Sequence, residues 1–201
     1  MSNDLMLDVG QANELKLAFR RVLFTNEDIK RLCEERDILS GLRDVLRGLA
    51  VITPVEHVID LDVDPFNPWA DDRWGVEEHQ KGGQWKWDAA QVTLHLSSSQ
   101  KGNRDVEGTK LRKELVDKGI PVLNANVLDY LLAHPHLIPE EWKKDGKGNT
   151  RYIFFWGTIY RYRNSRLCVR CLYWEDGSWN CTHYWLDDGY EDREPAAVRA
   201  A

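Results

Sequence analysis

The sequence contains no apolar run of about 18 residues, the minimum for a membrane-spanning helix. Its first residues, MSNDLMLDVGQANELK, lack the basic start and the apolar stretch of a secretory signal. A formal net charge of −6 disfavours nucleic acid as a non-specific partner, because phosphate binding relies on Lys and Arg. We therefore expect no membrane insertion and no nucleic-acid partner, with a cytoplasmic location by default or export by an unrecognised route.

Catalytic motifs are also missing. The chain has no Gly-rich phosphate loop, no nucleophile elbow and no HExxH, and its Ser, Cys and His residues show no triad spacing. We therefore expect a protein that is not an enzyme, with no catalytic residue and no cofactor.

One set of acidic and histidine residues could nevertheless carry chemistry. It consists of His57, Asp60, Asp62, Asp64, Glu77, Glu78 and His79. Carboxylates that alternate along a strand can bind a divalent cation, and Lys81 or Lys86 would add the positive charge that a nuclease needs. The competing interpretation is an ordinary solvated strand with an acidic side.

Cysteine is scarce, with four residues in 201. Cys33 lies in a predicted helix, which favours a buried thiol. Cys168 and Cys171 have the spacing of a zinc knuckle, but Cys181 and His183 would be an unusually tight second pair. Residues 168 and 171 of one strand would also point to opposite faces. The sequence therefore predicts no metal site.

The first 50 residues predict a helical segment. Apolar residues follow helical spacing over 12–23 and again over about 37–48, where Gly48 ends the pattern. Between these helices, Thr25 and Asp28 predict a capping box at the start of a further helix. A small bundle or docking arm is expected here.

Residues 51–201 predict an α+β domain. Alternation predicts a strand over 55–64, and WGVEEH and QWKWD predict two strands joined by a turn at 81–83. QVTLHL predicts another strand. The residues after it predict, in chain order, a helix over 109–118 capped by Thr109, a helix from Asn124 or Asn126 to Ala133, strands at 151–161 and 166–174 with a hairpin at Asn164-Ser165, and strands near 178–186. The fold class is α+β, with a helical segment, a mixed α/β scaffold and a β-rich C-terminal region.

Residues 152–198 mix aromatic residues with small, polar and charged ones. Tyr, Trp, Asn, Ser and Gly on a rigid frame make up antibody-like binding faces. Residues 151–170 carry five arginines and no acid, whereas residues 174–194 carry seven acids and one arginine. Two interpretations stay open: the two stretches pair inside the fold, or the acidic one is free to bind a basic or neutral ligand. Most of the aromatic residues are expected in the core of a small sheet.

The run FFWGTIYR, LxVRxLYW, WLD and PAAV, from Phe154 to Val198, resembles the variable proteins of diversity-generating retroelements, particularly those of small uncultured bacterial lineages. Residues 122–143 and 24–34 are similar to their constant part. In that family a reverse transcriptase copies a template with errors at adenines and replaces the C-terminal coding segment. The resemblance therefore implies a variable region at about 160–198 and a β-rich scaffold, in known cases mostly C-type lectin-like. Glu175, Glu191 and Glu194 fit this pattern less well, because adenine changes in AAY codons do not produce glutamate.

The resemblance implies a set of diversified, ligand-binding positions. They are Ser165, Cys168, Cys171, Asp176, Gly177, Ser178, Asn180, Cys181, Thr182, His183, Tyr184, Asp188, Gly189, Tyr190 and Arg193. The expected function is non-enzymatic binding of an unknown protein or surface ligand, in the manner of a receptor or adhesin. The alternatives are a metal-dependent nuclease or hydrolase using residues 56–64, and a mobile-element protein that binds a host component.

Overall fold

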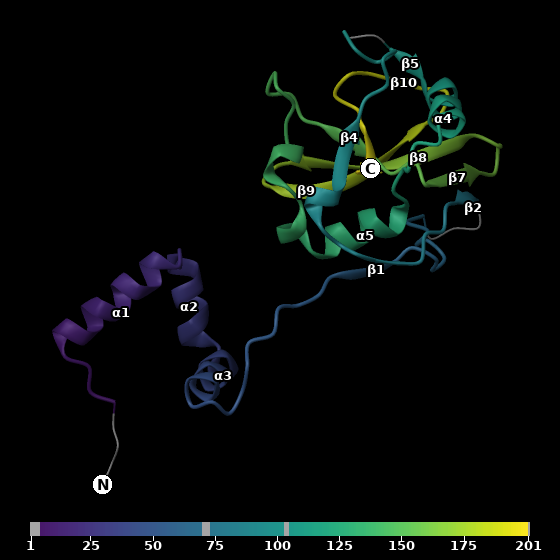
Figure 1. Ribbon diagram of the computed structural model, residues 1–201. Helices are drawn as coiled ribbons and strands as arrows, with labels where there is room; N and C mark the ends of the chain where they lie inside the picture. Colours follow the sequence, from purple (N-terminus) through teal and green to yellow (C-terminus); the bar gives the residue numbers. More distant parts are fainter. Residues whose placement is uncertain (1–4, 70–72, 103–104, 201) are drawn as a thin grey trace. The chain divides into compact units, whose positions relative to one another are not determined.

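The computed structural model describes residues 5–69, 73–102 and 105–200, and it divides into two compact units, Met1–Val55 and Glu56–Ala201 (Figure 1). The first unit contains three helices: α1 (Val9–Arg21), α2 (Asn26–Glu34) and α3 (Arg36–Leu46). The second unit combines two helices with a sheet, so the predicted α+β class is confirmed. Within the described ranges, no helix is long and apolar enough to cross a bilayer.

Side-chain caps set the starts of two helices in the first unit. The predicted capping box is confirmed: Thr25 Oγ1 accepts from the backbone N–H of Asp28, and Asp28 Oδ2 accepts from that of Thr25. Asp8 and Gln11 form the same arrangement before α1. The prediction of a buried Cys33 thiol is wrong, because no side chain among residues 5–55 is buried and Cys33 is exposed.

A mixed seven-stranded sheet forms the body of the second unit. Its strand order is β2-β7-β8-β6-β11-β4, and β9 pairs with β8; β11 runs parallel to β6 and every other pairing is antiparallel. Two further strand pairs, β1 with β3 and β5 with β10, lie outside it. The strands are β1 (Val58–Asp60), β2 (Trp74–His79), β3 (Gln84–Lys86), β4 (Val92–His95), β5 (Val106–Glu107), β6 (Tyr152–Phe154), β7 (Thr158–Tyr162), β8 (Leu167–Glu175), β9 (Ser178–Trp185), β10 (Gly189–Tyr190) and β11 (Ala196–Arg199).

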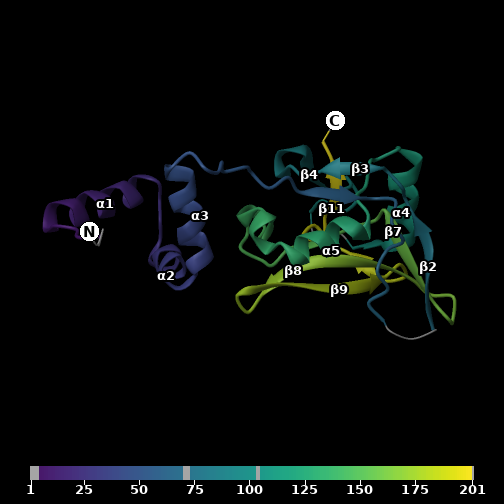
Figure 2. The ribbon, with the colours of Figure 1, turned by 90° about the horizontal axis from the view of Figure 1, so that it is seen from below.

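Two helices supply apolar side chains to two separate parts of the core. Helix α5 (Ala125–Ala133) begins at Asn124, whose side chain accepts from the N–H of Asn126, and its apolar residues pack with Leu172 of β8. Helix α4 (Gly108–Asp117) packs in a second cluster with Val169 and Cys171. These two side chains lie on the face of β8 opposite that of Leu172. Figures 1 and 2 show α5 alongside the sheet. Short 3-10 helices at 89–91, 135–137 and 140–142 complete the unit.

Three strand predictions and one cap prediction need correction. The strand expected over 55–64 is limited to β1, and β2 and β3 do not form a hairpin, because β2 pairs with β7 and β3 with β1. The strand expected over 151–161 is broken into β6 and β7 at Gly157. A Cβ atom there would lie 2.9 Å from the backbone of Leu123 and Asn124, so the chain segments cross in contact. Thr109 does not cap α4, which begins at Gly108.

A buried ion pair connects α5 to β8. The guanidinium of Arg170 is 3% exposed, and its two Nη atoms donate to the carboxylate of Asp129 at 3.0 and 2.7 Å. This two-bond geometry is the strongest form of an Arg–carboxylate contact. Arg170 lies in the middle of the sheet, so its buried charge requires a carboxylate beside it. Because Asp129 supplies that carboxylate, α5 lies against this part of β8.

We predict that Asp129→Ala destabilises the second unit by about 3–5 kcal/mol, because it leaves a buried guanidinium unpaired. Asp187→Ala is the matched control, since Asp187 pairs at the surface with Arg166 and such pairs contribute about 0–1 kcal/mol. Urea unfolding followed by tryptophan fluorescence measures both variants, because all nine tryptophans lie between residues 69 and 185. Equal losses for the two variants would contradict the prediction.

Candidate functional site

Strand β9 is an edge strand among the strands that the structure describes, since it pairs with β8 alone. Its register runs from Ser178 opposite Glu175 to Trp185 opposite Cys168. None of its eight side chains is buried. Alternation along the strand places two different sets of side chains on its two faces.

One face of β9 continues a cluster of tyrosines, and we call it the tyrosine face. The rings of Tyr152 and Tyr173 are stacked at 5.1 Å, and Tyr184 lies 5.8 Å from Tyr152. The guanidinium of Arg193 lies 5.7 Å from the Tyr152 ring centre, a cation–π distance. All of these side chains are half-buried. The tyrosine face consists of Tyr152, Tyr173, Asn180, Thr182, Tyr184 and Arg193.

The phenols of Tyr173 and Tyr184 stay protonated at neutral pH. Burial raises the pKa of Tyr173 and of Tyr184 above the usual value. A neutral phenol can both donate and accept a hydrogen bond while its ring supplies apolar contact area. The tyrosine face therefore combines flat apolar area with uncharged polar groups.

The opposite face of β9 is occupied by an aromatic stack. Trp74 stacks between Trp69, at 3.8 Å, and Trp185, at 5.4 Å, and His183 meets all three rings edge-on. Arg166 lies 4.3 Å from the Trp185 ring centre. Burial lowers the pKa of His183, which is therefore neutral at pH 7. Because the rings already contact one another, this stack serves mainly to join β9 to β2 and to the segment before it.

Two turns carry further candidate residues. The β8–β9 turn contains Asp176 and Gly177, at φ 50° and 78°, followed by the exposed Ser178. Asn180 Nδ2 donates to the carbonyl oxygens of Glu175 and Ser178, which holds this turn on the strand. Ser165, at φ 68°, lies in the predicted β7–β8 hairpin turn. All of these turn residues are exposed.

Three candidate residues lie in the core. Cys168, Cys171 and Tyr190 are 0% exposed. Cys168 and Cys171 belong to different core clusters on opposite faces of β8, as the strand geometry predicts. Burial raises the pKa of Cys168 to about 12 and that of Cys171 well above the usual value, so both are thiols at pH 7. These three side chains cannot contact a ligand in this structure.

The remaining candidates lie around the segment that follows β9. Asp188 is exposed and its Oδ2 accepts from the N–H of Trp185 at 3.1 Å, and Cys181 is exposed beside the buried Arg170, with 3.6 Å between Nη2 and Sγ. At Gly189 a Cβ atom would overlap the carboxylate of Asp105, 1.6 Å from Oδ1. Substitution at residue 189 therefore requires Asp105 to move.

The charged stretches pair only in part with each other. Arg166 donates to Asp187 at 2.7 Å, which links the basic stretch to the acidic one. Arg161 instead pairs with Glu77 of β2, and Arg170 with Asp129 of α5. The acidic stretch is paired inside the fold in part, since Asp187 contacts Arg166 and Asp192 contacts Lys147, and its binding of a ligand stays a prediction.

The side chains of the acidic set, which the sequence suggested as ligands of a divalent cation, do not point to one common position. Asp62 accepts from the N–H groups of Gly82 and Gly83 at 2.9 Å, which holds the pKa of its carboxyl below the usual value. Glu77 and Glu78 pair with Arg161 and Arg112. In the described part of the chain, no group of three or more His, Cys, Asp or Glu side chains is placed to hold a metal ion.

Sequence reasoning missed four aromatic residues beside β9. Tyr152 and Tyr173 complete the tyrosine face, and Trp69 and Trp74 complete the stack behind it. Trp69 and Trp74 are more than 100 residues from His183, and no local pattern reveals that contact. The alternation within 166–174 does place residue 173 on the same side as 169 and 171, so Tyr173 could have been found from the strand prediction.

Comparison with known proteins gives no relative: no family model, no curated protein and no solved structure matches this chain.

We predict that His183 makes the second unit less stable as the pH falls below 7. Its pKa is lowered in the folded state, so the unfolded state binds the proton first and stability is lost as the pH drops through the unfolded value of about 6.5. In His183→Gln this contribution disappears, and the urea midpoint falls less between pH 7 and pH 5 than in the wild type. Circular dichroism measures both series, with pH 8 as the reference. Parallel curves from pH 8 to pH 5 would refute the assignment.

Proposed function

We propose that this chain is a non-enzymatic ligand-binding protein of receptor or adhesin type, whose tyrosine face and adjoining turns contact a protein or surface ligand. We further propose that its C-terminal coding segment is diversified by a retroelement, as the resemblance of residues 154–198 implies. The C-type lectin-like arrangement that accompanies this resemblance stays a prediction.

One observation carries the proposal: the fixed and the variable positions of the resemblance differ in burial. Of the 21 fixed residues in FFWGTIYR, LxVRxLYW, WLD and PAAV, 15 are buried, although Trp185 and Asp187 on either side of Leu186 are not. Twelve of the fifteen candidate diversified residues are at least partly exposed. A protein that changes its ligand without changing its fold requires this division, because core substitutions cost far more stability than surface ones.

The support under the tyrosine face is rigid. Every residue of β9 has a partner in β8, and β8 is in turn paired with β6 and β7. A rigid frame loses little conformational entropy on binding, and tyrosine supplies large contact area with few rotatable bonds. Asn180 and Thr182 add adaptable hydrogen-bonding groups between the tyrosines.

Within this proposal, fewer residues can contact a ligand than the resemblance implies. Cys168, Cys171 and Tyr190 are in the core, and Gly189 is confined by Asp105. We therefore assign the ligand contacts to the non-buried candidates of β9 and its turns, together with Tyr152, which lies outside the run of the resemblance, and Tyr173, which belongs to its fixed frame.

Sequencing the coding DNA of residues 150–198 across the source population tests the diversification. We expect substitutions at 176–184 that trace to adenines of a nearby template repeat, with residues 186 and 195–198 unchanged. A reverse transcriptase gene beside the repeat is expected as well. A segment without variation and without a repeat would overturn the retroelement part of the proposal.

Stability measurements test the tolerance that ligand variation requires. We predict that Thr182 accepts Ser, Asp or Tyr with changes within about 0.5 kcal/mol. Cys171→Tyr is the buried counterpart on the same face of the sheet, and it should cost about 1–3 kcal/mol or more because it overpacks the core. Chemical denaturation of the variants gives these values. Losses at residue 182 as large as the loss at 171 would contradict the assignment.

A further inference from the structure

The helices of the first unit have no core of their own. Residues 5–55 contain no buried side chain, and the most covered apolar residues, Phe19, Ile29, Leu32 and Val45, are only half-buried. Sixteen large apolar side chains between residues 5 and 52 are exposed. The least exposed of these sixteen are Ile38 and Leu42 at 37%, and Leu17 and Phe24 at 41%.

Helices of this length need tertiary packing. α1, α2 and α3 have 13, 9 and 11 residues, and an isolated helix shorter than about 12–15 residues is marginal in water. Most helical stability in proteins comes from burying an apolar face. The helices therefore require a surface that covers these side chains.

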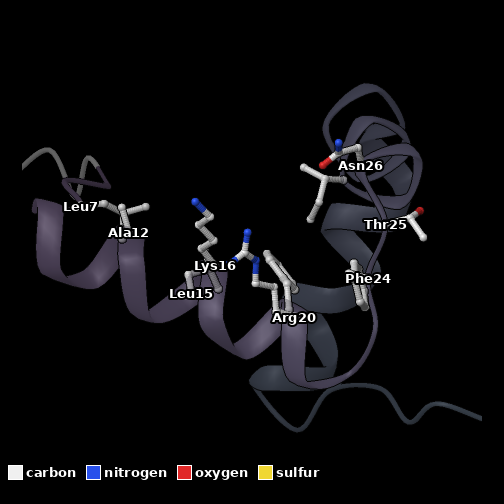
Figure 3. A pocket seen from close by; sticks show the side chains of 10 residues that line it. Leu7, Ala12, Leu15, Lys16, Arg20, Phe24, Thr25 and Asn26 are labelled. Carbon is white, nitrogen blue, oxygen red and sulfur yellow. The ribbon is translucent and has the colours of Figure 1, made fainter.

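The apolar residues line two adjoining grooves. One groove, of about 380 Å³, lies between α1 and the start of α2, with Leu15 and Phe24 in its lining and Lys16 and Arg20 projecting beside it (Figure 3). The other, of about 440 Å³, is lined by Phe24, Leu32 and Ile38. Phe24 belongs to both, so the grooves form one continuous apolar surface, which we call the helical groove.

We propose that the helical groove is covered by the same unit of a second copy of this chain, so that the protein is a dimer. The available area is sufficient. Burial of one large apolar side chain removes roughly 60–120 Å² from water, and a standard interface takes about 800 Å² from each partner. Six of the sixteen exposed side chains, Leu7, Leu15, Val22, Leu23, Phe24 and Ile38, line the helical groove, and exposed apolar side chains around it would supply the rest of that area.

The charges favour a second copy as the occupant. The first unit, Met1–Val55, carries nine acidic and eight basic side chains, a net charge of −1, although the whole chain has a net charge of −6. Two such units meet with little net repulsion. Lys16 and Arg20 beside the groove can face Glu27 and Asp28 in the first turn of the partner's α2, and a two-fold interface makes that contact twice.

Sedimentation velocity of the full chain across a wide dilution series tests the dimer. We expect a mass twice the 23.4 kDa of the monomer, with dissociation on dilution. Leu15→Asp places a charge in the groove and should raise the dissociation constant by roughly 100-fold or more. Val116→Asp is the matched control, because Val116 is an exposed apolar residue of α4 in the second unit, and this variant should stay a dimer.

Helix content provides a second measurement. On dilution the ellipticity at 222 nm should fall together with the mass, because the helices are stable only when covered. Tryptophan emission should stay constant, since residues 1–55 contain no tryptophan and the signal reports the second unit alone.

A variant outside the apolar lining separates loss of the dimer from loss of folding. Lys16→Glu with Arg20→Glu keeps good helix formers but changes the net charge of each unit from −1 to −5, so the dimer should weaken, and added salt should restore it. A wild-type chain that is monomeric throughout the series would overturn the proposal, as would a dimer that Leu15→Asp leaves unchanged.

Discussion

The buried guanidinium of Arg170 is the constraint on which the second unit depends. A charge that is 3% exposed at the centre of a sheet is stable only with a partner, and Asp129 of α5 meets it with two hydrogen bonds. α5 must therefore cover this face of β8. The opposite face then takes the second core cluster, with α4 and Tyr190, and β8 becomes a strand buried on both sides.

This burial explains why β9, and not β8, is suited to binding. The two strands have similar mixtures of aromatic, polar and sulfur-containing residues. The five residues of β8 from Cys168 to Leu172 are buried, however, whereas their partners in β9, Cys181 to Trp185, are not. Each β9 residue is supported by β8 on one side and is free of other strands, within the described residues, on the other. The frame and the contact surface are thus adjacent strands.

The local features of this fold could be predicted from the sequence, and the long-range ones could not. The Thr25 cap, the Asn164-Ser165 hairpin and the ranges of β8 and β9 follow from nearby residues. The pairing of β2 with β7 and the break at Gly157 depend on contacts with segments far along the chain. For the same reason, the sequence suggested fifteen candidate positions but not that Cys168, Cys171 and Tyr190 are core residues, since polar or aromatic type does not determine burial.

A dimer formed by the first unit would change what the second unit can bind. Each dimer carries two tyrosine faces, and residues 50–57, which contain no helix or strand, connect each face to the helices. Linked sites bind a repetitive surface more tightly than single ones, by about 10²–10⁴-fold when the linker spans the ligands. Under the proposed diversification, assembly through a separate unit would strengthen the binding of every variant, because the helical groove shares no residue with the tyrosine face.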